Sequence, residues 1–179
     1  MSRYVRRVEA SPDASHHTLT ETESAVRERI AGLAPDMTAM AAVQSIYRAG
    51  NAIRNHVERT VLAPHGLTWT GWVVLWVVWI WGEIETRHVA QEAGISKGTL
   101  TGVVATLEGK GLLTRADHPQ DGRRVLLTLT RKGRTLMTKL FPEFNAAETS
   151  VVEALGKTRT KDLTVALRTI VRNLEAEDE

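Results

Sequence analysis

The chain has 179 residues, of which 42% are hydrophobic and 25% are charged, so it is long enough for one cored domain with additional helices for assembly. It contains no cysteine, which excludes disulfides, thiolate metal ligands, cysteine nucleophiles and thiol-based redox sensing. The formal net charge is only +2, but residues 96–135 carry eight lysines and arginines against three acidic residues, a local basic field typical of a polyanion-binding face.

The N-terminal part of the chain predicts a tail and two helices. Residues 1–19 hold three arginines but no apolar run typical of a signal peptide, and we interpret them as a flexible tail. Thr20 and Glu23 have the spacing of a capping box that opens a short helix. Apolar residues then recur at three- and four-residue spacings over Thr38–Leu62, which predicts a long amphipathic helix that ends before Gly66.

The next segment, Trp69–Trp81, is the most apolar of the chain. It is 13 residues long, whereas a transmembrane helix needs about 20, so we expect a buried helix that starts at Thr68, no membrane partner and a cytoplasmic protein. Tryptophans spaced three, four and three residues apart form one stripe of this helix: Trp69, Trp72, Trp76 and Trp79. Aliphatic residues cover most of the remaining surface, so we expect burial on almost every side.

Two short helices, Arg87–Ala93 and Ser96–Gly109, follow on either side of Gly94. This glycine can adopt the positive φ that a tight turn between helices needs. In the second helix, apolar residues at i, i+3, i+4 and i+7 form one buried face: Leu100, Val103, Val104 and Leu107. Small hydrogen-bonding residues lie at its start, as a helix that enters the major groove of DNA requires. The pattern predicts a helix-turn-helix.

Leu112–Leu129 contains two extended runs that predict a β-hairpin, because apolar and polar residues alternate in the second run. We place its turn at Asp121-Gly122, directly before Arg123 and Arg124. An arginine at the tip of a projecting hairpin can enter a minor groove, where the negative potential favours it. Either Asp117 or Asp121 is positioned to hold that arginine through a charge-assisted hydrogen bond.

The C-terminal part predicts two further helices. One runs from Arg131 to about Ala154, with Pro142 expected to kink it unless a new segment starts there. The other, Thr160–Glu175, has an apolar face. A chain of this size cannot cover these faces and that of Thr38–Leu62 by itself, so we expect a second copy to cover them.

These elements predict a mainly α fold with a small β-hairpin wing, that is, a winged helix-turn-helix with N- and C-terminal dimerisation helices. The expected boundaries are a tail at residues 1–19, N-terminal helices of the dimerisation layer at 20–66, the DNA-binding winged module at 67–134, and C-terminal dimerisation helices at 135–179.

The run Ile95–Gly133 resembles the MarR family of bacterial winged helix-turn-helix regulators. The similarity lies in the recognition helix, the L-x-x-K-G-L-L-x-R connection from Leu107, the D-x-R wing motif from Asp121 and the closing L-T-x-x-G motif from Leu129. With the Gly-Leu-Thr entry that precedes the tryptophan-rich helix, the resemblance extends over about Thr38–Leu174.

This resemblance implies a homodimeric repressor that binds pseudo-palindromic double-stranded DNA, with half-sites about one helical turn, roughly 10 bp, apart. By position, four residues of the recognition helix would face bases or phosphates in the major groove: Ser96, Lys97, Thr99 and Thr101. Arg123 would enter the minor groove, and Arg115 and Arg124 would contact the DNA backbone.

In such regulators an aromatic ligand often lies between the dimer layer and the winged module, beside the helix that is tryptophan-rich here. The candidate pocket residues are Tyr47, His65, Trp69, Trp72 and Trp76. Simple core packing of the tryptophans and loop capping by His65 are the alternatives. Urate is not expected as the ligand, because Val73 occupies the position of the acidic ligand-binding residue of urate-responsive relatives.

Two other classes of function fit less of the sequence. A winged-helix protein-interaction module without DNA binding would not need the basic window or the wing arginines. An enzyme is not indicated, because the histidines lack metal-ligand spacing and neither a glycine-rich phosphate loop nor a nucleophile elbow is present. The sequence predicts no catalytic residue, no metal and no cofactor.

Overall fold

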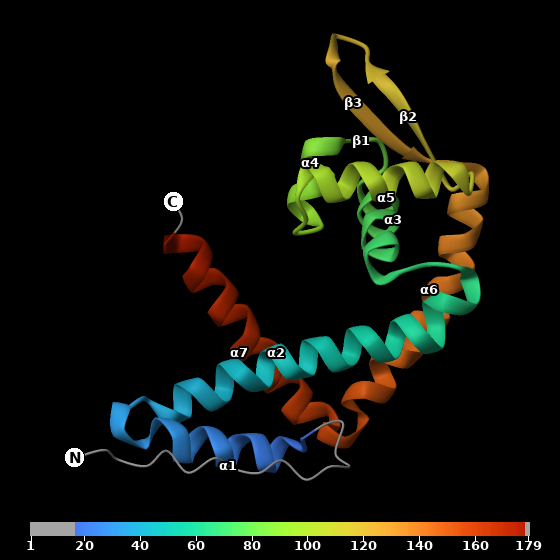
Figure 1. Cartoon of the computed structure of the whole chain (residues 1–179). Helices are drawn as coiled ribbons and strands as arrows, with labels where there is room; N and C mark the ends of the chain where they lie inside the picture. Colours follow the sequence, from blue (N-terminus) through green and yellow to red (C-terminus); the bar gives the residue numbers. More distant parts are fainter. Residues whose placement is uncertain (1–16, 178–179) are drawn as a thin grey trace. The chain divides into compact units, whose positions relative to one another are not determined.

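The computed structural model describes residues 17–177, and the chain divides into two compact units, residues 1–48 and 49–179. The described elements are helices and one three-stranded antiparallel sheet, in the order that a winged helix-turn-helix requires (Figure 1). The predicted fold class is therefore confirmed. The tail predicted at residues 1–19 lies, as far as residue 16, outside the described residues.

The first unit contains α1 (Leu19–Ile30), the short turn η1 (Ala31–Leu33) and the start of α2 (Met37–Val57). A capping box opens α1, but its residues are Thr18 and Glu21: the backbone N of Thr18 donates to Glu21 Oε2 at 2.7 Å, and the backbone N of Glu21 donates to Thr18 Oγ1 at 3.2 Å. The prediction of Thr20 and Glu23 was wrong. The Thr-x-x-Glu spacing occurs twice, and the start at Thr18 makes the helix two residues longer than the start at Thr20 would.

In the second unit, α2 passes into a π-helical turn, η2 (Glu58–Leu62), and a 3-10 turn, η3 (Ala63–His65), which ends at Gly66 with φ of 68°. Helix α3 (Trp69–Trp81) then begins as predicted, with Thr68 Oγ1 accepting from the backbone N of Gly71 at 3.1 Å. The carboxylate of Glu58 accepts a second hydrogen bond at this helix start, from the backbone N of Trp69 at 2.9 Å.

The middle of α3 is the centre of the core, where Val74, Leu75 and Val78 are at most 1% exposed. The last turn differs, since Ile80 and Trp81 are 54% and 62% exposed. Burial on almost every side was therefore wrong for this turn. Gly82, with φ of 77°, ends the helix directly after this turn. The elements that bury the middle of α3 do not cover Ile80 and Trp81.

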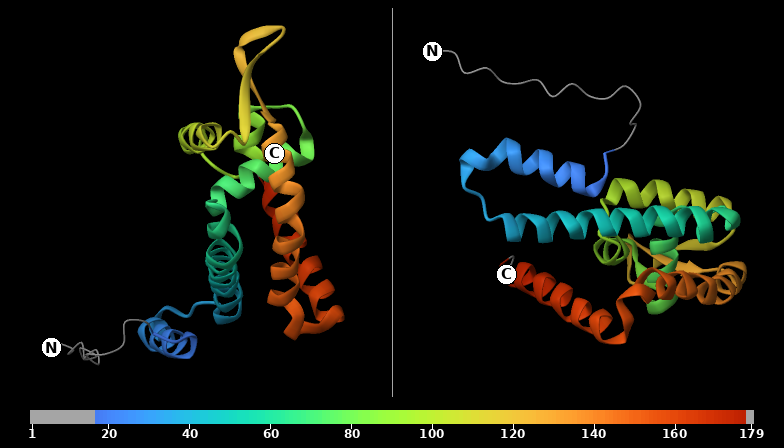
Figure 2. Two further views of the ribbon diagram at one scale, coloured as in Figure 1. Left: turned by 90° about the vertical axis from the view of Figure 1, so that its right-hand side faces the viewer. Right: turned by 90° about the horizontal axis from the view of Figure 1, so that it is seen from below.

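The winged module comprises β1 (Ile84–Glu85), α4 (Thr86–Glu92), α5 (Lys97–Gly109), β2 (Leu113–His118) and β3 (Asp121–Leu129). Its sheet has the strand order β1-β3-β2. The β2–β3 hairpin projects beyond the helices of the module (Figures 1 and 2, left). Strand β1 was not predicted, because a strand of two residues carries no periodicity.

The hairpin turn lies at Pro119-Gln120, and Asp121 is already paired with His118 at the start of β3. The turn predicted at Asp121-Gly122 was therefore wrong. The ring of Pro119 presets the backbone angle that the first central position of a turn needs, so it outweighs the Asp-Gly signal two residues later.

Helix α6 (Arg131–Val152) follows the hairpin, and the turn η4 (Glu153–Leu155) connects it to α7 (Gly156–Glu177). Pro142 lies inside α6 and does not begin a new segment. Helix α7 begins four residues before the predicted Thr160, directly at Gly156, whose φ of 68° makes the turn from η4.

The core of the second unit joins α3, α5, α6 and the sheet. Its fully buried members include Leu75, Leu113, Leu127, Met137 and Leu140. Within residues 17–177, no single helix is long and apolar enough to cross a bilayer, although α2 with its extension and α3 pass that test together as a bent pair.

Candidate nucleic-acid interface

The start of α5 is a capped and exposed helix end. Ser96 Oγ accepts from the backbone N of Thr99 at 3.1 Å and lies 2.8 Å from Thr99 Oγ1. Lys97 and Thr101 are exposed on the same helix, whereas Leu100 and Val104 are at most 2% exposed. The helix thus presents the predicted polar edge to solvent while its apolar face anchors it to the core.

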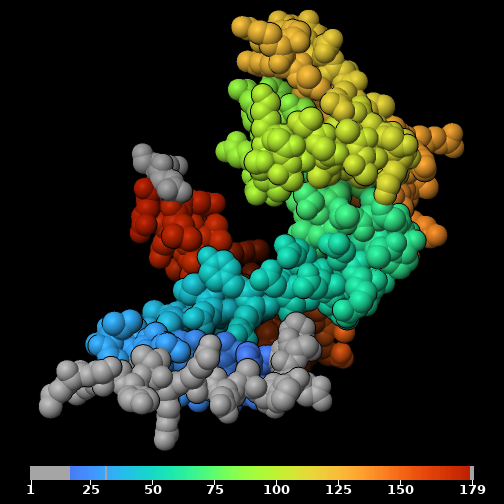
Figure 3. All heavy atoms as spheres, viewed as in Figure 1, coloured from blue at the N-terminus to red at the C-terminus, as the bar shows by residue number. Residues whose placement is uncertain are grey.

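A shallow hollow brings three of the predicted residues together. Lys97 and Thr101 from α5 line it with Arg115 from β2, and Val125 of β3 closes its wall. Its volume is about 160 Å³. Helix α5 and the hairpin therefore border one continuous surface, which Figure 3 shows in yellow-green to orange at the top of the view. The cationic groups of Lys97 and Arg115 are donors suited to phosphates, and the Thr101 hydroxyl, which donates to the backbone O of Lys97 at 2.9 Å, is left as an acceptor.

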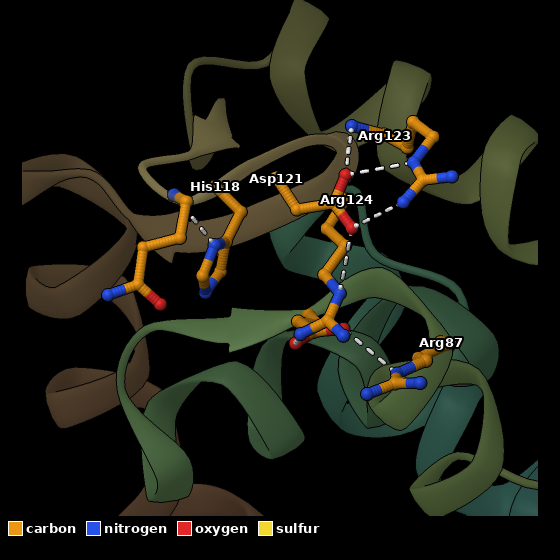
Figure 4. A network of polar contacts seen from close by, with 7 residues as sticks. Arg87, His118, Asp121, Arg123 and Arg124 are labelled. Atoms are coloured by element: carbon orange, nitrogen blue, oxygen red, sulfur yellow. Dashed lines mark hydrogen bonds and ion pairs between the residues drawn. The ribbon is translucent and has the colours of Figure 1, made fainter.

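On the hairpin, Asp121 holds Arg123 (Figure 4). Asp121 Oδ1 accepts from both the backbone N and Nε of Arg123, at 3.1 and 3.0 Å. Arg123 Nη2 also donates to Asp121 Oδ2 at 3.4 Å, so the carboxylate holds one edge of the guanidinium, whereas the side chain as a whole is 91% exposed. Hydrogen bonds from Arg123, followed by the charges of Arg124 and His118, lower the pKa of the Asp121 carboxyl.

Of the two aspartates predicted to hold an arginine of the hairpin, Asp121 is the one that contacts Arg123 in this structure. Asp117 lies exposed on β2, opposite Val125, and its carboxylate makes no hydrogen bond or ion pair within the described residues.

Arg124 bridges the hairpin to the start of the helix-turn-helix. Its Nη1 lies 3.2 Å from Glu85 Oε1, and its Nε lies 3.5 Å from Asp121 Oδ2. The other oxygen of Glu85 pairs with Arg87 Nε at 2.8 Å. Because the Glu85 side chain is only 13% exposed, this carboxylate is shielded from solvent and ties β1, β3 and α4 together (Figure 4).

Arg115 is paired within the chain, since its Nε donates to Glu108 Oε2 at 2.6 Å. This hydrogen bond raises the pKa of Arg115 above its already high ordinary value. The side chain remains 39% exposed, so its outer edge faces solvent while Glu108 fixes the rest.

The predicted ligand residues divide between separate places. Trp69, Trp72 and Trp76 line one cavity of about 440 Å³, here called the aromatic cavity. His65 lines a different hollow with Lys110, Arg131, Lys132 and Lys139, and its Nε2 lies 3.3 Å from Glu143 Oε2. Tyr47 lies on α2 in the first unit, with 70% of its surface exposed.

Helix α6 supplies residues of the aromatic cavity that the sequence analysis missed. Phe141, Phe144, Asn145 and Glu148 complete its wall. The Phe144 ring stacks on Trp72 with 4.3 Å between centroids, and Phe141 stacks on Trp76 at 5.5 Å. The three- and four-residue spacing of Phe141, Phe144 and Glu148 was the available signal, since it places them on one face of a helix.

Glu85 was also missed, because the strand that carries it was not predicted. Among the residues that the structure describes, no group of three histidine, cysteine, aspartate or glutamate side chains has an arrangement that could hold a metal ion.

Comparison with known proteins identifies relatives with the same architecture. The sequence model of the MarR family matches residues 67–125. The uncharacterized HTH-type transcriptional regulator YwaE of Bacillus subtilis is 31% identical over 159 residues, which are 89% of this chain and 90% of that protein.

Two solved structures resemble this one with TM-scores of 0.68. BpsR of Bordetella bronchiseptica, whose DNA binding is regulated by 6-hydroxynicotinic acid, is 25% identical, over 73% of this chain and 98% of that chain. Sco3205 of Streptomyces coelicolor, a MarR family transcriptional regulator solved in complex with DNA, is 22% identical, over 75% of this chain and 90% of that chain, and it shares the fold.

Proposed function

This chain belongs to the MarR family of transcriptional regulators, and on that premise we propose that it is a cytoplasmic, homodimeric repressor released from DNA by a small aromatic molecule. In this proposal residues 67–134 bind DNA, whereas residues 20–66 and 135–179 form the dimer layer. Two copies of the winged module then meet a pseudo-palindromic duplex at half-sites about 10 bp apart.

The single observation that carries the DNA-binding proposal is the capped, exposed start of α5 beside a hairpin whose outermost arginine is pre-oriented. Four side chains of α5 would contact the major groove: Ser96, Lys97, Thr99 and Thr101. Arg123, whose guanidinium is held along one edge by Asp121 and whose side chain is 91% exposed, would enter the minor groove. Arg115 and Arg124 would contact phosphates with the edges that their carboxylate partners leave open.

The dimer proposal rests on apolar surface that a single chain leaves exposed. On α7, Leu163, Ile170 and Leu174 recur at helical spacing and are 42%, 43% and 57% exposed. On α2, Val43 and Ile46 are 50% and 37% exposed. Exposed apolar helix faces mark interaction sites, and a second copy of the chain would cover them.

The ligand proposal rests on the aromatic cavity. Its volume of about 440 Å³ falls within the range of small-molecule sites, and its wall is aromatic with a few polar groups. Since α3 and α6 both line it, a ligand there would contact the helix that leads into the winged module and the helix that leads out of it. In BpsR the molecule that regulates DNA binding, 6-hydroxynicotinic acid, is small and aromatic, which supports an aromatic effector here but not a particular charge of that effector.

Fluorescence anisotropy with the DNA upstream of the protein's own gene tests the DNA-binding proposal. The full-length chain should bind this duplex more tightly than a scrambled duplex at moderate salt. Arg123→Ala should weaken the binding by about 1–3 kcal/mol, or roughly 5- to 150-fold, because one groove contact is lost. Arg59→Ala, which removes an exposed arginine of η2, is the matched control and should bind like the parent chain.

Equal affinity for the specific and scrambled duplexes would contradict the proposal, as would equal losses in the two arginine variants. In either case the basic surface would bind DNA only as a polyanion.

A further inference from the structure

The described wall of the aromatic cavity combines aromatic rings with one negative charge. Five rings surround it: Trp69, Trp72, Trp76, Phe141 and Phe144. Their π faces carry partial negative charge. The only formally charged group in the described wall is the carboxylate of Glu148, and no lysine, arginine or histidine of residues 17–177 lines the cavity.

The exposed side chains of Asn145 and Glu148 supply hydrogen-bond acceptors to the cavity. Asn145 Nδ2 donates to Glu148 Oε2 at 3.0 Å, and the two residues lie one helical turn apart on α6. This bond orients the carboxylate and leaves the carbonyl oxygen of Asn145 as a further acceptor. A ligand with a positive charge or several N–H donors therefore meets these acceptors. An anionic carboxylate meets the like charge of Glu148 and finds only neutral N–H donors, those of Asn145 and of the indole rings.

We propose that the aromatic cavity selects an organic cation, an aromatic compound that carries a quaternary or protonated amine, over an aromatic acid. Glu148 supplies the opposing charge, and the ring faces that the stacked pairs Trp72–Phe144 and Trp76–Phe141 leave open add cation–π attraction. This inference rests on the proposed function only for its regulatory consequence, because the charge preference follows from the described wall itself.

The cavity differs sharply from the second large hollow of the same unit. That hollow, of about 990 Å³, is lined by Lys110, Arg131, Lys132 and Lys139 and suits anions. The two sites therefore have opposite charge preferences, and an acidic compound that binds the protein is expected at the basic hollow.

Three probes of similar size but different charge test the proposal on the full-length chain: benzyltrimethylammonium, benzyl alcohol and phenylacetate. Quenching of tryptophan fluorescence reports occupancy, since three of the five tryptophans line the cavity, and calorimetry gives the Kd. Benzyltrimethylammonium should bind at least tenfold more tightly than phenylacetate, with benzyl alcohol between them.

Glu148→Gln separates charge from shape, because glutamine keeps an acceptor for Asn145 but removes the negative charge. It should weaken benzyltrimethylammonium about five- to tenfold, in a manner reduced by salt, and leave benzyl alcohol unchanged. Glu153→Gln, at an exposed glutamate of η4 outside the cavity, is the matched control and should change neither. Tighter binding of phenylacetate, or equal effects of the two variants on the cation, overturns the proposal.

An anisotropy measurement with saturating benzyltrimethylammonium distinguishes this inference from the proposed function. Release of DNA by the parent chain but not by Glu148→Gln supports both. Cation binding that depends on Glu148 without any DNA release supports the charge preference and contradicts ligand-driven release. If the chain binds the cation but shows no specific DNA binding, the result supports the charge preference of the aromatic cavity and contradicts the proposed repressor function.

Discussion

At the scale of single residues, the arginines of the wing are held by carboxylates that use both of their oxygens. Asp121 contacts Arg123 and Arg124, and Glu85 contacts Arg124 and Arg87. Three cations thus share two anions, which leaves the cluster with one net positive charge. Under the proposed function, each arginine would meet DNA with part of its rotamer freedom already lost, so binding would remove less of it.

Loss of the Asp121 carboxylate should therefore weaken DNA binding without unfolding the chain. In Asp121→Ala, Arg123 keeps its charge but regains rotamer entropy, and we expect a roughly three- to tenfold rise in Kd by anisotropy. Asp117→Ala removes the neighbouring exposed carboxylate of β2 and is the matched control. If both variants gain or lose affinity equally, general charge rather than orientation explains the effect.

The pH dependence of the contact between Asp121 and Arg123 follows from the direction in which the pKa of Asp121 is shifted. Hydrogen bonds from Arg123 lower the pKa of Asp121, so the carboxylate is ionised above its ordinary pKa of about 3.9 and the contact is lost only as the pH falls through the lowered value. The ratio of Kd between Asp121→Ala and the parent chain should therefore stay constant from about pH 5.5 to 8. A ratio that falls toward one within that window would contradict the assignment.

At the scale of elements, one glycine sets how closely α6 approaches the connection between α5 and β2. Gly133 is buried, and its backbone N donates to Thr130 Oγ1 at 3.0 Å. A Cβ at this position would collide with the carbonyl oxygen of Leu112 and lie 3.0 Å from the carbonyl carbon of that residue. Because backbone atoms cannot rotate away, the helix would have to shift.

Gly133→Ala should therefore lower the free energy of unfolding by about 2–4 kcal/mol, although alanine is the better helix former. Gly102→Ala is the matched control, because this glycine of α5 has nothing within 4 Å of an added Cβ. It should raise the free energy of unfolding by about 0.5–1 kcal/mol. Urea unfolding followed by circular dichroism measures both values, and equal signs for the two variants would contradict the clash.

Helices with a long apolar periodicity were predictable from sequence. Helix starts and turns for which two neighbouring sequence signals competed were not. Helices α3 and α5 have caps, Thr68 and Ser96, directly before a periodic run, so their starts were correct. Two overlapping capping boxes and a Pro-Gln turn beside an Asp-Gly pair each offered two solutions of similar local energy. In those cases the number of backbone hydrogen bonds and the angles of Pro119 decided the outcome.

The candidate sites show the same division. The residues proposed on α5 and at the wing could be named from sequence because their positions depend on neighbours in sequence. Glu85 and the α6 wall of the aromatic cavity depend on tertiary contacts across more than thirty residues, such as the pair of Glu85 and Arg124. Periodicity does not report which helix faces which.

At the scale of the whole molecule, the exposed apolar faces predict the assembly state. Light scattering after gel filtration should give about twice the chain mass of 19.8 kDa. Ile170→Glu on the apolar face of α7 should shift the protein toward the single-chain mass, because a charge would be buried in the interface. Arg168→Glu, on another face of the same helix, should not. A monomeric parent chain would contradict the dimer.

Ile170→Glu should also abolish the gain in affinity that a duplex with two half-sites provides over a duplex with one. A monomer presents one winged module, so the affinity of Ile170→Glu for the full site should fall to that for a single half-site. Anisotropy with full-length and half-site duplexes measures this difference. If the half-site already accounts for the whole affinity of the parent chain, paired recognition is contradicted.

The shielded carboxylate of Glu85 has a mechanical consequence. It joins the strand before the helix-turn-helix to the arm that carries Arg124, so hairpin and helices resist bending against each other. A stiff unit of this kind transmits displacement instead of absorbing it. A small rotation of α3 or α6 would accordingly move α5 and the Arg123 hairpin together. In the proposed dimer, a ligand would then regulate DNA binding by changing the distance between the two winged modules.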